Sequence, residues 1–92
     1  MVNNDRRAYP RTPASWPVRI TVDDSLILGR ALDVSEYGLC VLLAPTAALK
    51  RGQSCRVEIV VDALAAFAST AEIRHVGEGT VGLQTTERVA LP

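Results

Sequence analysis

Short apolar segments separated by turn-forming residues constrain the fold of this chain more than any other feature of its sequence. Val18, Ile20 and Val22 alternate with polar residues, which is typical of a strand with one buried face. Comparable apolar segments follow at 26–32, 39–43, 56–61, 71–75 and 81–85. The connections between them are too short for the crossovers that parallel strands require, so we expect an all-β fold with antiparallel pairing.

The segment 63–68 gives conflicting signals. Its alanines favour helix by intrinsic propensity, whereas the regular spacing of the flanking segments favours a hairpin. We interpret this segment as strand and turn. A closed barrel removes the exposed edges that a small sheet must otherwise protect. The sequence therefore predicts a six-stranded antiparallel β-barrel.

The length of 92 residues supports one domain, and a hydrophobic content of 48% argues against disorder. Residues 1–13 are polar and contain Pro10 and Pro13, which disfavour helix in the residues before them. We therefore predict a flexible N-terminal arm over 1–13 and a single barrel domain over 14–92. Because little sequence follows the last expected strand, we expect little or no C-terminal helix.

Charge and cysteine content exclude several classes of protein. Lys+Arg and Asp+Glu number 10 each, so the net charge is zero, unlike that of a strongly basic domain that binds nucleic acid polymers. Cys40 and Cys55 are too few for a disulfide framework and lie in apolar stretches, so we expect buried free thiols and a reducing compartment. No signal peptide or membrane-spanning segment is recognisable. We expect a cytoplasmic protein.

Positive charge is concentrated near the N-terminus. Arg6, Arg7 and Arg11 lie close together, and only Asp5 opposes them there. Arginine presents a planar fork of donors that fits phosphate oxygens or the edge of guanine, and it also stacks on flat rings. Local positive charge on a neutral protein suits a small anion better than a long polyanion. The alternative interpretation is a solvated charged terminus.

A second polar segment, Asp33–Gly38, connects two expected strands. Asp33 and Ser35 favour a turn because their side chains bond nearby backbone groups, and Gly38 can adopt a positive φ at no steric cost. A carboxylate can also accept two donors from the edge of guanine, and a serine hydroxyl can bond a base or a phosphate. Taken alone, the segment favours an ordinary turn over a binding site.

Taken together, the two segments form the pattern Arg-x-x-x-Arg followed by Asp-x-Ser-x-x-Gly, which resembles the PilZ domain family. Pro17–Ile20, Gly52 and Val81–Leu83 also fall in the order typical of that family. The resemblance covers residues 5–86. It implies a six-stranded barrel whose arginine arm folds across the barrel mouth, with cyclic di-GMP as the ligand.

The resemblance also implies a role for each site residue. Arg7 and Arg11 would grip guanine edges and phosphates, Asp33 and Ser35 would hold the other polar edges of the ligand, and Gly38 would let the backbone pass close to it. The implied protein is a bacterial second-messenger signalling module that needs no cofactor. It would pass its signal to a downstream effector protein.

Two further positions refine the resemblance. Arg6 directly precedes Arg7, and in this family an arginine there tends to accompany binding of an intercalated ligand dimer. Gln84 departs from the family, which usually has an aromatic or apolar residue at that position. We therefore expect the closure of the barrel to differ from that of its relatives.

Three other function classes agree less well with the sequence. A ligand-independent interaction adaptor on the same barrel would not need the arginines and the turn motif. A small barrel that binds single-stranded nucleic acid would be expected to have more than 4% aromatic residues. An enzyme would need paired carboxylates, a metal cluster or an activated nucleophile at a usable spacing, and none is recognisable. We therefore do not expect an enzyme.

Two features of the later strands are interpreted as structural. Gly77–Gly82 matches the pattern Gly-x-Gly-x-x-Gly, but the residues after it form an expected strand instead of the helix that dinucleotide binding requires. We expect a hairpin turn there. His75, the single histidine, has no zinc-ligand spacing and is expected near the barrel end, on the same face as Ala71 and Ile73.

Overall fold

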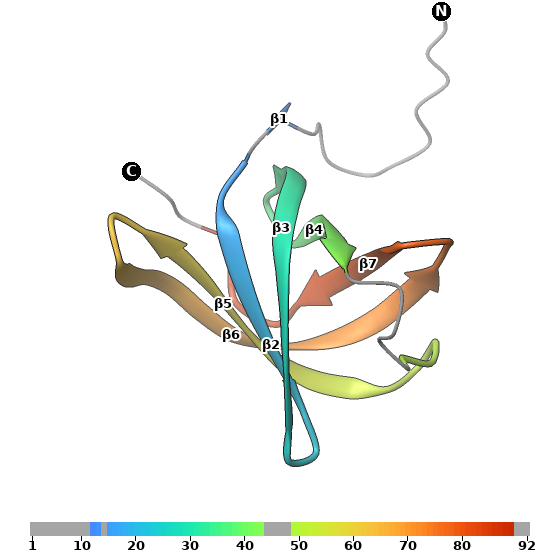
Figure 1. Ribbon diagram of the computed structural model, residues 1–92. Coiled ribbons are helices and arrows are strands. Elements are labelled where there is room, and N and C mark those ends of the chain that lie inside the picture. The colour runs from blue at the N-terminus through green and yellow to red at the C-terminus, as the bar shows by residue number, and fades with distance from the viewer. Residues whose placement is uncertain (1–11, 14, 44–48, 90–92) are drawn as a thin grey trace, which may run out of the picture.

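The computed structural model describes residues 12–13, 15–43 and 49–89, which form strands and turns without a helix (Figure 1). The strands are β1 (Thr12–Pro13), β2 (Pro17–Val22), β3 (Ser25–Ser35), β4 (Gly38–Leu43), β5 (Ser54–Val61), β6 (Leu64–Val76) and β7 (Thr80–Thr85). All pairings are antiparallel, in the order β1-β3-β2-β5-β6-β7-β4, and an additional pairing of β3 with β4 closes the ring. Six strands thus form the predicted closed barrel, and β1 extends the edge of β3. A search of these residues for a helix able to cross a membrane found none.

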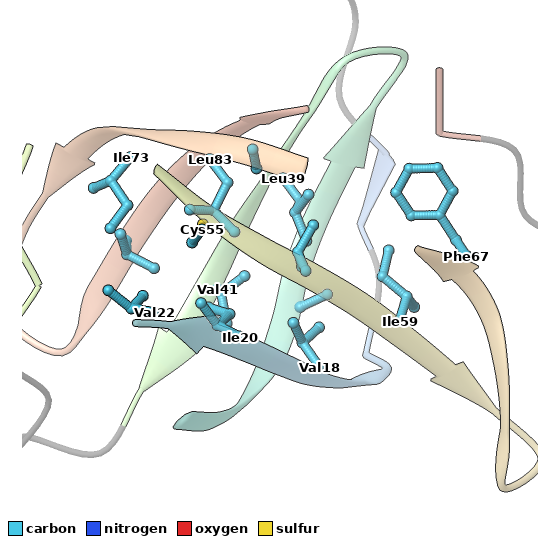
Figure 2. Close-up of a cluster of buried hydrophobic side chains, with 14 residues drawn as sticks. Val18, Ile20, Val22, Leu39, Val41, Cys55, Ile59, Phe67, Ile73 and Leu83 are labelled. Carbon is cyan, nitrogen blue, oxygen red and sulfur yellow. The ribbon is translucent and has the colours of Figure 1, made fainter. Parts of the chain in front are cut away.

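Alternating side chains fill the interior of the barrel. Val18, Ile20 and Val22 of β2 are all buried, as their spacing predicted. They pack with inward side chains from the other long strands in one hydrophobic cluster (Figure 2). Fully burying an aliphatic side chain contributes roughly 1.5–3 kcal/mol relative to leaving it exposed. Because the core uses one face of each strand, the opposite face is left for function.

Closure of the barrel requires a glycine where β3 meets its two neighbours. Gly29 pairs with Val18 of β2 and with Leu43 of β4. A Cβ atom at this position would lie 2.6 Å from the carbonyl oxygen of Leu42 and 2.7 Å from the side chain of Val41. Such distances are shorter than real Cβ contacts. Any larger residue would push β3 and β4 apart.

The hairpin interpretation of the alanine-rich segment is confirmed. β5 and β6 are joined by Asp62 and Ala63, and both residues have positive φ, at 53° and 64°. Two positive φ values in a two-residue loop define the turn whose twist suits a β-hairpin. Cross-strand pairing therefore overrides the helical propensity of the alanines. The glycine-rich segment also forms a hairpin turn, in which the N–H of Gly77 donates to the carbonyl oxygen of Thr80 at 2.9 Å.

His75 lies near the end of β6 as expected, but the face predicted for it is wrong because the alternation of β6 is interrupted. Ile73 pairs with Leu83 and faces the core, but His75 pairs with Gly82, so Arg74 is an extra residue in β6. This bulge turns the side chain of His75 to the outside, where it is exposed. A bulge of this kind re-aims side chains without altering the apolar pattern that precedes it.

The ladder around the barrel continues through Gln84, since β7 pairs there with both β4 and β6. Gln84 lies on the outer face, exposed to solvent, between Gly38 of β4 and Glu72 of β6. The two cysteines form no disulfide, and only one of them matches the prediction. Cys55 is buried, and this burial raises the pKa of its thiol, whereas Cys40 is only partly buried.

Candidate functional site

β3 presents two motif side chains on the outer face of the barrel. Val34 packs against the core, so its neighbours Asp33 and Ser35 point away from it, because side chains alternate along a strand. The β3–β4 ladder places Asp33 opposite Cys40 and Ser35 opposite Gly38. The fold therefore brings the three predicted turn-motif residues, Asp33, Ser35 and Gly38, together on one surface.

The role of Gly38 differs from part of the expectation. Among the described glycines, positive φ occurs at Gly52 and Gly79, so Gly38 does not supply the left-handed conformation. Instead it is the first residue of β4 and lies directly opposite Ser35, whose hydroxyl is 3.4 Å from the Gly38 carbonyl oxygen. Gly38 adds no side chain to the outer face beside Ser35, and the residue itself is buried. Its contribution to the candidate site is therefore its place opposite Ser35.

The N-terminal side of the chain joins the barrel at the same motif. In β1, Thr12 pairs with Val34 and Pro13 pairs with Asp33, and Figure 1 shows β1 beside the end of β3. Arg11 directly precedes Thr12 in the sequence. The arginine segment is therefore covalently attached next to the turn motif. The predicted ligand-binding arginines themselves lie outside the described residues: Arg6, Arg7 and Arg11.

A segment outside the two sequence motifs forms bonds with the β3–β4 turn. The N–H of Thr85 donates to the carbonyl oxygen of Tyr37 at 3.0 Å, and the N–H of Val89 donates to that of Glu36 at 2.7 Å. The guanidinium of Arg88 also forms an ion pair with the Glu36 carboxylate at 2.7 Å. Both residues of the β3–β4 turn are thus bonded to the residues at and after the end of β7.

Hydroxyl groups fix the same segment to β6. The Thr86 Oγ1 atom lies 3.2 Å from Ser69 Oγ and 2.7 Å from Thr70 Oγ1. The N–H of Glu87 donates to Ser69 Oγ at 3.1 Å, and the N–H of Thr86 donates to the carbonyl oxygen of Thr70 at 3.0 Å. Residues 85–89 therefore bridge the motif turn and β6.

A groove of about 640 Å³ lies over β5, β6 and β7. Its volume is within the range typical of small-molecule sites. The groove reaches the motif through Gln84, which pairs with Gly38 on one side and with Glu72 on the other. The lining residues are Ser54, Cys55, Thr70, Ala71, Glu72, Arg74, Gln84, Thr85 and Thr86. Within the described ranges, no three His, Cys, Asp or Glu side chains gather into a possible metal site.

Comparisons with known proteins agree with this geometry. The family model for the PilZ domain matches residues 5–90. The structure resembles that of the Bacillus subtilis inhibitor of motility (MotI/DgrA), with a TM-score of 0.75 and 25% identity over 94% of this chain, which spans 44% of that protein. It also resembles the PilZ domain of CeSA from a cellulose synthesizing bacterium, with a TM-score of 0.70, 25% identity, and coverage of 84% of this chain and 80% of the other. No curated protein matches the sequence.

Proposed function

This chain belongs to the PilZ domain family, a family of cyclic di-GMP receptors, and we propose that it binds cyclic di-GMP on the outer face beside the β3–β4 turn. One observation carries the proposal. Asp33, Ser35 and Gly38 lie beside β1, which pairs with β3 at the motif and directly follows the arginine segment in the sequence. No other part of the described surface combines the family motif with an adjacent arginine cluster in this way.

The chemistry of the ligand matches these groups. Cyclic di-GMP carries two phosphate charges and two guanines, so it offers both anionic oxygens and flat hydrogen-bonding edges. Arg7 and Arg11 donate to the phosphates and to the guanine edges, where a guanidinium fork fits bidentately. The Asp33 carboxylate accepts from the N–H groups of a guanine, and the Ser35 hydroxyl bonds a remaining polar edge.

The surface beside the motif provides space for such a ligand. Gly38 adds no side chain opposite Ser35, so a guanine or phosphate bound beside Ser35 meets no side chain from that position of β4. Gln84 follows on the outer face and leads into the groove over β5–β7. A ligand that starts at the motif can therefore extend across β7 without meeting a bulky apolar group.

Arg6 bears on how many ligand molecules each chain binds. A third guanidinium beside Arg7 can stack on the guanine of a second, intercalated ligand molecule. We expect two ligand molecules per wild-type chain and one per chain in Arg6→Ala, measured as the molar ratio in isothermal titration. An unchanged ratio in the variant would remove Arg6 from the site.

Members of this family are regulatory binding modules, and we propose that this one signals to an effector protein. The proposal is supported by one similar structure, which belongs to a protein described as an inhibitor of motility. Ligand binding that orders a surface shifts the population of a partner-competent state. The output is therefore expected to be a change in protein interaction.

The arginine pair provides the decisive test of ligand binding. Arg7→Ala or Arg11→Ala is expected to abolish cyclic di-GMP binding in isothermal titration and to leave thermal unfolding unchanged, because both residues precede the first described strand in the sequence. Arg51→Ala serves as the matched control, since it removes an exposed arginine from a turn outside the motif. Unchanged affinity in both arm variants would refute the proposed site.

A thermal shift experiment distinguishes the alternative function. A ligand that binds only the folded state stabilises it by about 2.7 kcal/mol at a concentration of 100 Kd. Excess cyclic di-GMP is therefore expected to raise the melting temperature of the wild-type chain. No rise at millimolar ligand would favour the ligand-independent adaptor on the same barrel.

A further inference from the structure

We infer that residues 85–89 are a positioning element of the ligand site, which holds the β3–β4 turn in the shape that cyclic di-GMP requires. This inference rests on the proposed function. It extends the site beyond the arginine segment and the turn motif to a segment that carries neither. Its central residues are Arg88 and Val89, which bond Glu36 between Ser35 and Gly38.

The side-chain bond across the turn is longer than the backbone bonds that reach the turn from the end of β7. Within it, the side chain of Ser35 reaches the carbonyl oxygen of Gly38 only at 3.4 Å, which is long for a hydrogen bond between two oxygens. The carbonyl groups of Glu36 and Tyr37 instead accept from Val89 and Thr85, at 2.7 and 3.0 Å. The shorter bonds are therefore supplied by a segment about fifty residues further along the chain.

Residues 85–89 are bonded to β6 and packed against the core, so they can act as a brace that holds the turn in place. Ser69 is 3% exposed, and its hydroxyl receives the N–H of Glu87 at 3.1 Å and contacts Thr86 Oγ1 at 3.2 Å. The side chain of Val89 packs against the core cluster. A shift of the turn would strain bonds to β6 as well as bonds within the turn. Binding to a turn fixed in this way costs less conformational entropy than binding to one that must be ordered.

The ion pair and the backbone hydrogen bond are expected to affect ligand affinity to different extents. Arg88 and Glu36 have side chains that are 67% and 40% exposed, and exposed ion pairs change an equilibrium constant by at most about fivefold. One net backbone hydrogen bond corresponds to roughly a two- to twelvefold change. The bond from Val89 to Glu36 is therefore the better target.

The coupling between ligand binding at the turn and the bonds of residues 85–89 must be reciprocal. If the segment favours the ligand-competent turn, bound ligand favours the bonded segment by the same factor. Ligand is therefore expected to slow hydrogen exchange at the amide of Val89. The Gly52 amide, which donates to Ile73 in a turn away from the motif, is the internal reference.

A pair of substitutions at Val89 separates the bond from the packing. Val89→Pro removes the N–H donor together with the valine contacts, whereas Val89→Ala removes the contacts and keeps the donor. We expect isothermal titration with cyclic di-GMP to give an affinity about two- to twelvefold weaker for Val89→Pro than for Val89→Ala. Equal affinity in the two folded variants would overturn the inference.

A second variant covers the case in which Val89→Pro fails to fold. Arg88→Ala removes only an exposed guanidinium, and we expect a loss of affinity of about 1.5- to fivefold. Arg88→Lys should restore part of it. The control is Arg19→Ala, which breaks the comparable ion pair of Arg19 with Glu58 at 3.2 Å between β2 and β5. Equal affinity of Arg88→Ala, Arg19→Ala and the wild type would overturn the inference.

The outcomes also separate this inference from the proposed function. If the wild-type chain does not bind cyclic di-GMP, the proposed function fails. In that case hydrogen exchange of residues 36–38 in the ligand-free protein decides whether the segment holds the turn. Faster exchange there in Val89→Pro than in Val89→Ala would support the brace, and equal exchange would refute it.

Discussion

The β5–β6 turn and the β3–β4 turn have the same length but are stabilised in different ways. Asp62 and Ala63 reverse the chain with their own backbone, since both adopt positive φ and both are exposed. Glu36 and Tyr37 are partly buried, neither has a positive φ, and both accept bonds from the segment at the end of β7. The comparison indicates that a plain hairpin is shaped locally, whereas the turn of the binding motif is shaped by a distant part of the chain.

Lengthening each turn by two glycines should produce the largest difference between them. Between Asp62 and Ala63, doubling the loop should cost on the order of 0.6 kcal/mol in closure entropy and leave ligand affinity unchanged. Between Glu36 and Tyr37, the same insertion displaces both tethered carbonyl groups and should abolish cyclic di-GMP binding. Chemical denaturation and isothermal titration of both insertions measure this. Equal loss of binding in both would remove the distinction between the turns.

Replacing one aspartate beside each turn should have the next largest effect. Asp33→Ala removes a carboxylate expected to accept two guanine donors, a contact worth about 1–3 kcal/mol, so affinity should fall by at least about fivefold. Asp62→Ala removes an exposed carboxylate from the other turn and should leave affinity at the wild-type value. Titration of both variants checks this pair. A loss in Asp62→Ala equal to that in Asp33→Ala would point to a general effect of charge.

Glycine substitution should produce the smallest effect, with a different sign at each turn. Ala63→Gly relieves a left-handed backbone that costs about 1–2 kcal/mol in other residues, offset by about 0.4–1 kcal/mol from the freer unfolded chain. The central values leave a net gain of about 0.8 kcal/mol, which should raise the melting temperature by roughly 3–6 °C. Tyr37→Gly relieves no such strain and should lower the melting temperature. A rise in both variants would contradict the comparison.

Most of the barrel could be predicted because the alternation of apolar and polar residues along a strand indicates which side chains are buried. The spacing of Val18, Ile20 and Val22 carries the signature of an inward face, and all three are buried. His75 was misplaced because a single extra residue in β6 reverses the alternation after Ile73, and no residue type marks that bulge. Such irregularities arise from pairing with a distant strand, which a local pattern does not contain.

The position of the motif residues in the candidate site could be predicted, but the bonds that hold their turn could not. Asp33, Ser35 and Gly38 are recognisable by type and spacing, and the ladder brings them together. The bonds from Thr85 and Val89 to the turn are made by backbone N–H groups, which every residue except proline possesses. Side-chain identity therefore gives no indication of them before the topology is known.

The pairing of β1 with β3 also has a consequence for how firmly the ligand is held. Thr12 is fixed opposite Val34, and Arg7 precedes it by only five residues, a reach of at most about 18 Å. The proposed ligand-binding arginines are thus tethered by a short stretch of sequence to Thr12, and short tethers give effective concentrations in the millimolar range. If the ligand binds at Asp33 as proposed, capture of its other end becomes an intramolecular event.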